Sequence, residues 1–254
     1  MRLPRVSLPE DMPLDVVDLR AFYASPLGAV AHRVVSRAVD RFLGPVSGLR
    51  VLGLGYATPY LAEARATAER VLAFMPATQG VVNWPARGLS ASALSDPTMM
   101  PLPDAVVDRM VVVHALEASD SPAELLHEAW RLLTPGGRLI VVVPNRRGVW
   151  ARRDVTPFGH GQPYSRSQLN RLMRDTLFSP EGWDEVLYAP PVAGWLTIRT
   201  AGAWEGLGTG LALPFAGLHV VDATKQLYRP VTVRPVRRTA RRASPALVPA
   251  PSAG

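Results

Sequence analysis

MMPLPDAVVDRMVVVHALEASDSPAELLHEAWRLLTPGGRLIVVVPN, residues 99–145, sets out a strand, a helix and a second strand in that order. The apolar run at 110–113 is rich in β-branched residues and stops at a polar segment, as a buried parallel strand does at a ligand crevice. Leucine and alanine then recur at helical spacing over 125–133. Pro-Gly-Gly at 135–137 ends this helix before a second apolar run at 138–143. The short connections predict a right-handed βαβ unit.

The start of the predicted helix carries a second local signal. Ser121 precedes Pro122, and Glu124 stands three residues after the serine. This spacing is typical of a capping box, in which serine and glutamate side chains each accept a backbone amide of the first helical turn. We therefore expect the helix to begin at Pro122, with Ser121 as its N-cap.

The rest of the chain continues the alternation of helices and strands. Helices are expected at 12–24, 27–43, 59–70 and 165–177, and further strands at 49–54, 71–75, 92–95, 183–188 and 218–223. Seven strands with interleaved helices predict a doubly wound α/β sheet in a single domain. We expect residues 1–44 to form N-terminal helices that cap this domain, and residues 45–228 to form the domain itself.

The sequence of residues 99–145 resembles the class I S-adenosylmethionine-dependent methyltransferases of the small-molecule (type 11) kind. In that family, motifs of the form LPxPD, HxLEH and LxPGGxLxxxxPN recur in the same order. The loop at 156–169 also resembles a group of bacterial methyltransferase-like proteins with a degenerate glycine motif. The resemblance implies a Rossmann-like sheet of order 3-2-1-4-5-7-6 with strand 7 antiparallel. It further implies S-adenosylmethionine as the cofactor and methyl transfer as the reaction.

The cofactor of such a fold lies beyond the carboxyl ends of the strands, at the point where the strand order reverses. Here this point is the turn VLGLGYATPYL, residues 51–61. The resemblance assigns cofactor contact to Gly53, Gly55 and Ala57, and to Met75 at the end of the second strand. Glycine stands at 53 and methionine at 75, where the family usually has acids that hold the cofactor. The alternative for the two glycines is a tight turn that binds nothing.

Two more contacts follow from the resemblance. Asp96, in Ser95-Asp96-Pro97, is assigned to the adenine amino group, and His114, at the end of the fourth strand, to the methionine end of the pocket. A turn-capping role is the alternative for Asp96, and a structural role is the alternative for His114. Glu117 is expected to cap or orient the following loop.

The substrate side is expected in the long polar loop at 146–164, because loops over the crevice select substrates in this fold. His160 and Tyr164 are the candidates for removing a proton from the acceptor, with loop anchoring as the alternative for both. Catalytic residues otherwise stay unassigned, and no metal site is expected. The apolar insert at 200–221 would be either a lid for a lipophilic substrate or, as we favour, core packing.

The net positive charge lies at the end of the chain and not in the part that is expected to fold. Residues 225–254 contain seven basic residues and no acid, which equals the whole net charge of +7. Residues 229–254 are rich in Pro, Arg and Ala without periodic apolar positions, and a disordered basic tail is predicted. Because residues 1–224 are formally neutral, we expect no specific nucleic-acid partner.

Composition sets the remaining expectations. The chain has no Cys, no apolar run of signal-peptide type at its start and no run long enough to span a bilayer, so a cytoplasmic protein is expected. Peripheral contact with a membrane surface is compatible with the apolar insert, and the oligomeric state stays open. The expected function is methyl transfer to a small-molecule or lipid-like acceptor. The alternative is a catalytically inactive binding or scaffold protein of the same fold.

Overall fold

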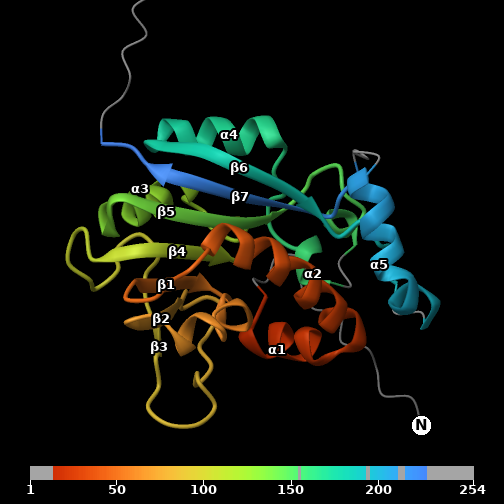
Figure 1. The fold of residues 1–254 in the computed structure, drawn as a ribbon, viewed down its shortest axis with the longest axis horizontal. Helices are drawn as coiled ribbons and strands as arrows, with labels where there is room; N and C mark the ends of the chain where they lie inside the picture. The colour runs from red at the N-terminus through yellow and green to blue at the C-terminus, as the bar shows by residue number, and fades with distance from the viewer. Residues whose placement is uncertain (1–13, 154–155, 193–194, 211–214, 228–254) are drawn as a thin grey trace, which may run out of the picture.

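One seven-stranded sheet forms the centre of the fold (Figure 1). The structure, a computed structural model, describes residues 14–227 apart from 154–155, 193–194 and 211–214. Its strands are β1 (Arg50–Gly55), β2 (Arg70–Met75), β3 (Ser92–Leu94), β4 (Val107–Val113), β5 (Leu133–Pro144), β6 (Phe178–Val186) and β7 (Leu218–Lys225). Their order is β3-β2-β1-β4-β5-β7-β6, and β7 is antiparallel to both neighbours. The predicted Rossmann-like sheet in a single domain is confirmed.

Within the described part of the chain, five α-helices accompany the sheet. They are α1 (Val16–Ala24), α2 (Pro26–Leu43), α3 (Pro122–Leu132), α4 (Arg166–Asp175) and α5 (Trp195–Gly210), with short 3-10 turns η1 (Thr58–Tyr60), η2 (Ala64–Ala66), η3 (Trp150–Arg152) and η4 (Pro157–Gly159). In Figure 1, α2 crosses in front of the sheet and packs beside α1, and α4 lies along β6. The two predicted N-terminal helices are therefore present.

Each face of the sheet builds its own hydrophobic core. Val111 and Val113 of β4 pack with α2, whereas Met110 and Val112 pack with α3 and α4 on the other face. This alternation follows from the two-residue period of a strand. Because both faces are covered, the central strands are apolar on both sides, as the sequence run at 110–113 indicates.

The predicted helix at 59–70 is wrong. The structure has only the turns η1 and η2 between β1 and β2. The carbonyl of Pro59, which a helix would use internally, instead accepts a hydrogen bond from His32 Nε2 of α2 at 2.9 Å. Packing of this segment against α2 thus replaces the regular α-helical bonding.

The capping box predicted at Ser121 is also wrong, although α3 does begin at Pro122. The Ser121 side chain makes no capping hydrogen bond, and its own amide donates to the Ser119 hydroxyl at 3.2 Å. Because the Ser121 amide already donates to Ser119, it is not available to the Glu124 side chain, which would accept it in a capping box. A capping box does form at α4, between Ser165 and Gln168.

Three boundaries in the second half differ from the sequence prediction. β5 begins at Leu133 rather than 138, and β6 covers Phe178–Val186 rather than 183–188. The insert at 200–221 contains the end of α5 and the start of β7, and Trp204 and Leu207 are exposed. The favoured interpretation, core packing, therefore holds for residues 216–221, which lead into and form β7 and are buried, but not for Trp204 and Leu207. The predicted tail at 229–254 lies outside the described residues.

A buried histidine on β7 makes stability depend on pH. Burial, with a smaller contribution from the positive charge of Arg166, lowers the pKa of His219 from 6.5 to about 4. Glu185 Oε1 lies 3.6 Å from its Nδ1, and neither ring nitrogen has a hydrogen bond among the described residues. The unfolded chain therefore binds a proton between pH 6.5 and 4 while the folded chain resists it.

We expect the folded protein to lose about 2 kcal/mol of unfolding free energy through His219 as the pH falls from 7 to 5. Urea denaturation of the wild type and of His219→Leu at several pH values would measure this. The variant should lack that part of the pH dependence. An identical pH dependence in both proteins would contradict the prediction.

Candidate functional site

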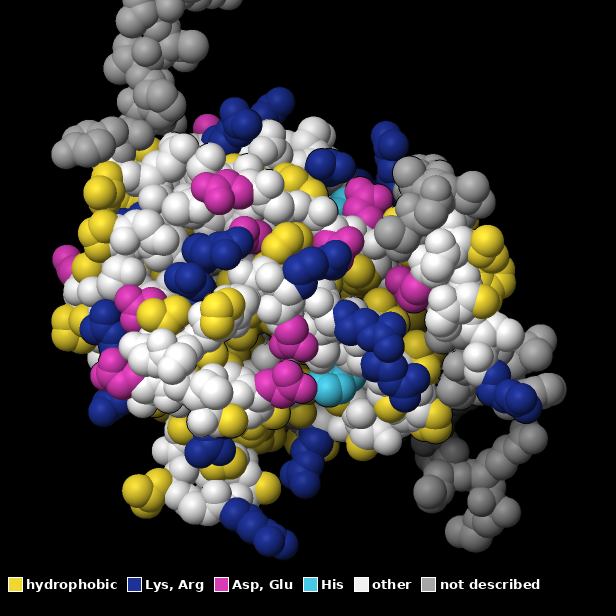
Figure 2. Space-filling model, viewed as in Figure 1, with side chains coloured by type: hydrophobic (Ala, Val, Ile, Leu, Met, Phe, Trp, Pro, Cys, Tyr) yellow, Lys and Arg dark blue, Asp and Glu magenta, His cyan; other side chains and the backbone are white. Residues whose placement is uncertain are grey.

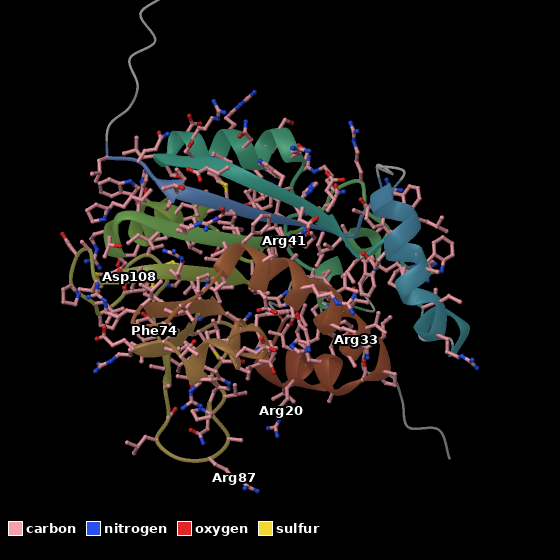
Figure 3. All side chains as sticks on the ribbon, in the orientation of Figure 1. Arg20, Arg33, Arg41, Phe74, Arg87 and Asp108 are labelled. Atoms are coloured by element: carbon pink, nitrogen blue, oxygen red, sulfur yellow. The ribbon has the colours of Figure 1, made fainter. Side chains whose placement is uncertain are left out.

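The carboxyl ends of β1, β2 and β4 meet beneath α1. Figure 3 labels Asp108, near the start of β4, at the left of the molecule and Arg33, on α2, at the right, so β4 runs towards the N-terminal helices. Val16 and Leu19 of α1 pack against Tyr56 and Met75, which follow β1 and end β2. The crevice predicted at the switch point is thus covered by α1.

The glycine turn after β1 lies directly against the end of β4. Gly55 has φ +77°, and a Cβ at this position would lie 2.2 Å from the carbonyl oxygen of Val113. The amide of Tyr56 donates to that oxygen at 2.9 Å. Gly53 meets side chains instead, because a Cβ there would lie 2.5 Å from Leu61 Cδ1 and 2.9 Å from Ala57 Cβ. Backbone conformation and packing therefore require glycine at 55, whereas at 53 the Leu61 side chain would have to shift to admit a larger residue.

His114 follows β4 and is the centre of a buried polar chain. Its Nε2 lies 2.9 Å from the Tyr23 hydroxyl, which lies 2.8 Å from the Tyr60 hydroxyl. Its Nδ1 lies 3.3 Å from Glu117 Oε1. Burial, then the neighbouring charges and phenols, raise the pKa of Tyr23, and burial also raises the pKa of Tyr60.

The hydroxyl groups of Tyr23 and Tyr60 therefore keep their protons at neutral pH and act as hydrogen-bond donors. One consistent assignment has Tyr60 donating to Tyr23, and Tyr23 donating to His114 Nε2. This leaves the Nδ1–H of His114 facing Glu117 Oε1. The arrangement orients the imidazole from both sides.

Aromatic rings surround the histidine. The Phe158 ring of η4 lies 4.7 Å from the His114 ring between centroids, and the Trp150 ring of η3 lies 5.8 Å from Phe158. The Tyr23 ring stacks on Tyr56 at 5.5 Å. Trp150 is fully buried, and its Nε1 donates to the Ala189 carbonyl at 2.8 Å. Four separate segments thus contribute aromatic rings to one apolar cluster around His114.

Three buried acceptor atoms beside His114 lack a donor. Both carboxylate oxygens of Glu117 and Oε1 of Gln79 have no hydrogen-bond partner among the described residues. Gln79 Nε2 donates to the His114 carbonyl oxygen at 2.8 Å. Sequence reasoning missed Gln79, although a polar residue four positions after the second strand was a signal that could have found it.

Most of the predicted cofactor contacts come together at the same end of the sheet. Gly53, Gly55, Ala57, Met75 and His114 all lie at the ends of β1, β2 and β4, and all five are buried. Their contact with a cofactor stays a prediction.

Asp96 follows β3 and has a local role. Its exposed carboxylate accepts hydrogen bonds from the amide and the hydroxyl of Thr98 at 2.8 and 2.7 Å. The Thr98 hydroxyl, and then its amide, lower the pKa of Asp96. This geometry is that of the turn cap given as its alternative, and the adenine contact stays a prediction.

The two candidate bases occupy the loop after β5. Tyr164 is buried, its hydroxyl donates to the Leu116 carbonyl at 3.4 Å, and its amide donates to the Pro144 carbonyl at 3.0 Å. Burial raises its pKa to about 12, so the phenol stays protonated. These contacts support the anchoring role for Tyr164. His160 is half-buried, and its amide donates to the Pro157 carbonyl.

Comparison with known sequences finds methyltransferases. Residues 47–141 match the model of a protein family described as a methyltransferase domain. The chain is 34% identical over 84 residues to a probable S-adenosylmethionine-dependent methyltransferase of Mycolicibacterium smegmatis (strain ATCC 700084 / mc(2)155). That match covers 32% of this chain and 32% of the relative, about a third of the length of each.

Solved structures share the fold. One is an S-adenosylmethionine-dependent methyltransferase of Thermotoga maritima, described as a possible histamine N-methyltransferase, with a TM-score of 0.60 and 18% identity over 83% of this chain and 96% of that one. Another is geranyl diphosphate C-methyltransferase of Streptomyces coelicolor A3(2), in complex with Mg²⁺, geranyl diphosphate and S-adenosyl-L-homocysteine. Its TM-score is 0.55, with 17% identity over 76% of this chain and 78% of that one.

Proposed function

We propose that this chain, which belongs to the class I S-adenosylmethionine-dependent methyltransferase family, transfers the methyl group of that cofactor to a small-molecule or lipid-like acceptor. The observation that carries the proposal is the meeting of the Gly53–Ala57 turn with His114. The two lie at the ends of β1 and β4, where the strand order reverses. Ligands of open α/β sheets bind at this place.

The residues of the crevice fit the cationic methionine end of the cofactor better than its ribose. Glu117 and Gln79 offer buried acceptor atoms without donors, which favour a positively charged ligand rich in N–H groups. At the end of β2 the crevice offers only the buried side chain of Met75. We expect the ribose hydroxyls to be held by backbone groups or water.

The bound cofactor would supply an electrophilic methyl group, and the chain would align the acceptor with it. Alignment of this kind accounts for most of the catalysis in reactions that need few dedicated side chains. His114 is placed to take a proton from an acceptor hydroxyl or amine, since Glu117 faces its Nδ1. Phe158 and Tyr23 would exclude water from the reacting groups.

Entry of the ligands requires α1 to shift. Tyr23 is hydrogen-bonded to His114, and Val16 and Leu19 are buried against Tyr56 and Met75. The amide of Val16 also donates to the Gln79 carbonyl at 2.7 Å. A short helix at the start of a domain is among the elements that open most readily.

Charge and exposed apolar surface support a small or lipid-like acceptor over a nucleic acid. Figure 2 shows Lys and Arg side chains interspersed with Asp and Glu over the face in view, without one continuous basic stripe. Nucleic-acid grooves combine such a stripe with stacked aromatic rings. Trp204, Leu207 and Phe215 are at least 37% exposed at the edge formed by α5 and the start of β7. This apolar edge favours a lipophilic acceptor.

A catalytically inactive protein of the same fold is the second candidate. Leu61 and Ala57 pack against Gly53, where the family usually has an acid, and aromatic side chains cover this end of the sheet. Binding of the cofactor separates the two candidates, because an inactive scaffold has no need to retain it.

We expect titration calorimetry to detect binding of S-adenosylmethionine and S-adenosylhomocysteine to the full chain. Each missing charge-assisted hydrogen bond costs about 1.5–3 kcal/mol, so the affinity should be about tenfold or more below that of family members with both acids. Asp96→Ala should weaken binding further if Asp96 contacts the adenine. Asp175→Ala, an exposed substitution on α4, is the matched control. Absence of binding to either compound would favour the inactive scaffold.

A further inference from the structure

We propose that Glu117 and Gln79 hold the positively charged methionine end of the cofactor, in place of the two carboxylates that the chain lacks at 53 and 75. This inference rests on the proposed function. It assigns to Glu117 and Gln79 the binding of the methionine end, for which the glycine turn and the end of β2 offer no carboxylate. Three observations support it. The carboxylate of Glu117 has no hydrogen-bond donor among the described residues, the side chain of Gln79 is held in one orientation, and both residues contact His114.

Glu117 is a buried carboxylate with unmet hydrogen-bonding capacity. The residue is 4% exposed, and neither oxygen accepts a hydrogen bond from the described residues. Its one ion-pair contact there is His114 Nδ1 at 3.3 Å, which lacks hydrogen-bond geometry. Burial of a carboxylate is costly unless donors or a cation compensate for the lost water. A ligand that brings positive charge and N–H groups would supply that compensation.

Gln79 presents a second acceptor in a fixed orientation. Its Nε2 donates to the His114 carbonyl at 2.8 Å, so exchanging the amide nitrogen and oxygen would set two acceptors against each other. Its backbone is held on both sides, because its amide donates to the Pro76 carbonyl and its carbonyl accepts the Val16 amide. The side-chain oxygen, at a residue only 5% exposed, is left without a donor.

His114 brings the two acceptors together. Glu117 contacts its imidazole, and Gln79 contacts its backbone carbonyl. Its φ of +54° is unusual for a residue with a side chain and turns the chain sharply at the end of β4. The rings of Tyr23 and Phe158 lie against the imidazole, and aromatic faces attract cations. A cationic ammonium with a nearby sulfonium matches this combination of acceptors and rings.

Three related ligands test the assignment. S-Adenosylmethionine carries both an ammonium and a sulfonium, S-adenosylhomocysteine carries the ammonium alone, and 5′-methylthioadenosine carries neither. We expect Glu117→Gln to weaken the first two about tenfold or more and to change the third less than twofold. Gln79→Ala should weaken the first two by about fivefold and again spare the third. Calorimetry on the full chain gives all nine affinities, including the wild type.

Matched controls separate this role from loss of the fold. Glu124→Gln replaces an exposed glutamate at the start of α3, and Gln226→Ala replaces a half-buried glutamine just beyond β7. Both should leave all three affinities unchanged. The melting temperature without ligand is a second readout, because removing an uncompensated buried charge should keep or raise it. A purely structural pair between His114 and Glu117 predicts a lower melting temperature in Glu117→Gln.

The outcomes are distinct. Wild-type binding together with unchanged affinities in Glu117→Gln and Gln79→Ala would overturn this inference and leave the proposed function standing. Equal weakening of all three ligands would also overturn it, since the effect would not depend on the cationic end. A wild type that binds none of the three compounds would overturn the proposed function, and this inference with it.

Discussion

Replacing Gly55 with alanine is expected to lower the free energy of unfolding by about 3–5 kcal/mol. Two effects add here. The backbone at φ +77° disfavours any side chain, and the new Cβ would lie 2.2 Å from the Val113 carbonyl oxygen. Since that oxygen is a backbone atom of β4, β1 and β4 would have to separate. Equilibrium urea denaturation measures the change.

Gly136→Ala is the matched control for this substitution. Gly136 has a similar φ of +73°, but a Cβ there would have no neighbour within 4 Å. Only the conformational cost applies, and we expect a loss of about 1–2 kcal/mol. Equal losses in the two variants would contradict the close approach of β1 and β4 at the candidate site.

Replacing Trp150 with alanine is expected to lower the free energy of unfolding by about 4 kcal/mol. The side chain is fully buried, its Nε1 donates to the Ala189 carbonyl, and its ring packs on Phe158 and Gly217. The substitution leaves a large cavity and removes the donor to a buried carbonyl. Because Phe158 supports His114, cofactor affinity should fall together with stability.

Trp204→Ala tests whether burial causes the effect. Trp204 lies on α5 and is 40% exposed, and alanine favours a helix, so we expect a change within about 0.5 kcal/mol. Trp150→Phe should lose less than Trp150→Ala, since it keeps most of the packing but not the donor. A Trp150→Ala protein within about 1 kcal/mol of the wild type would contradict this account.

The sheet could be predicted because its signals are local. The β-branched run at 110–113, the helix that begins at Pro122 and the return strand before Asn145 each follow from short-range patterns. Once one βαβ unit is set, the handedness of its connection restricts the rest. The order of the strands in the sheet came from family resemblance, because periodicity alone does not fix strand order.

Local signals failed where another residue takes a backbone group that the predicted pattern would use. The segment at 59–70 has helix-forming composition, yet His32 takes the Pro59 carbonyl and the helix does not form. Ser121 has the right spacing for a capping box, but its amide bonds to Ser119. In both places a hydrogen bond outside the expected pattern accompanies the departure from the predicted local structure.

The sequence by itself determined the strands of the sheet and placed Gly55 and His114 at the ends of two of them, because these depend on strand periodicity and position along the chain. Only the tertiary structure decided what surrounds His114. Tyr23 reaches it from 91 residues away, and Gln79 from 35 residues away across the end of β1. The lack of donors on Glu117 is likewise a property of the packed interior, where water that would satisfy a carboxylate in the unfolded chain is excluded.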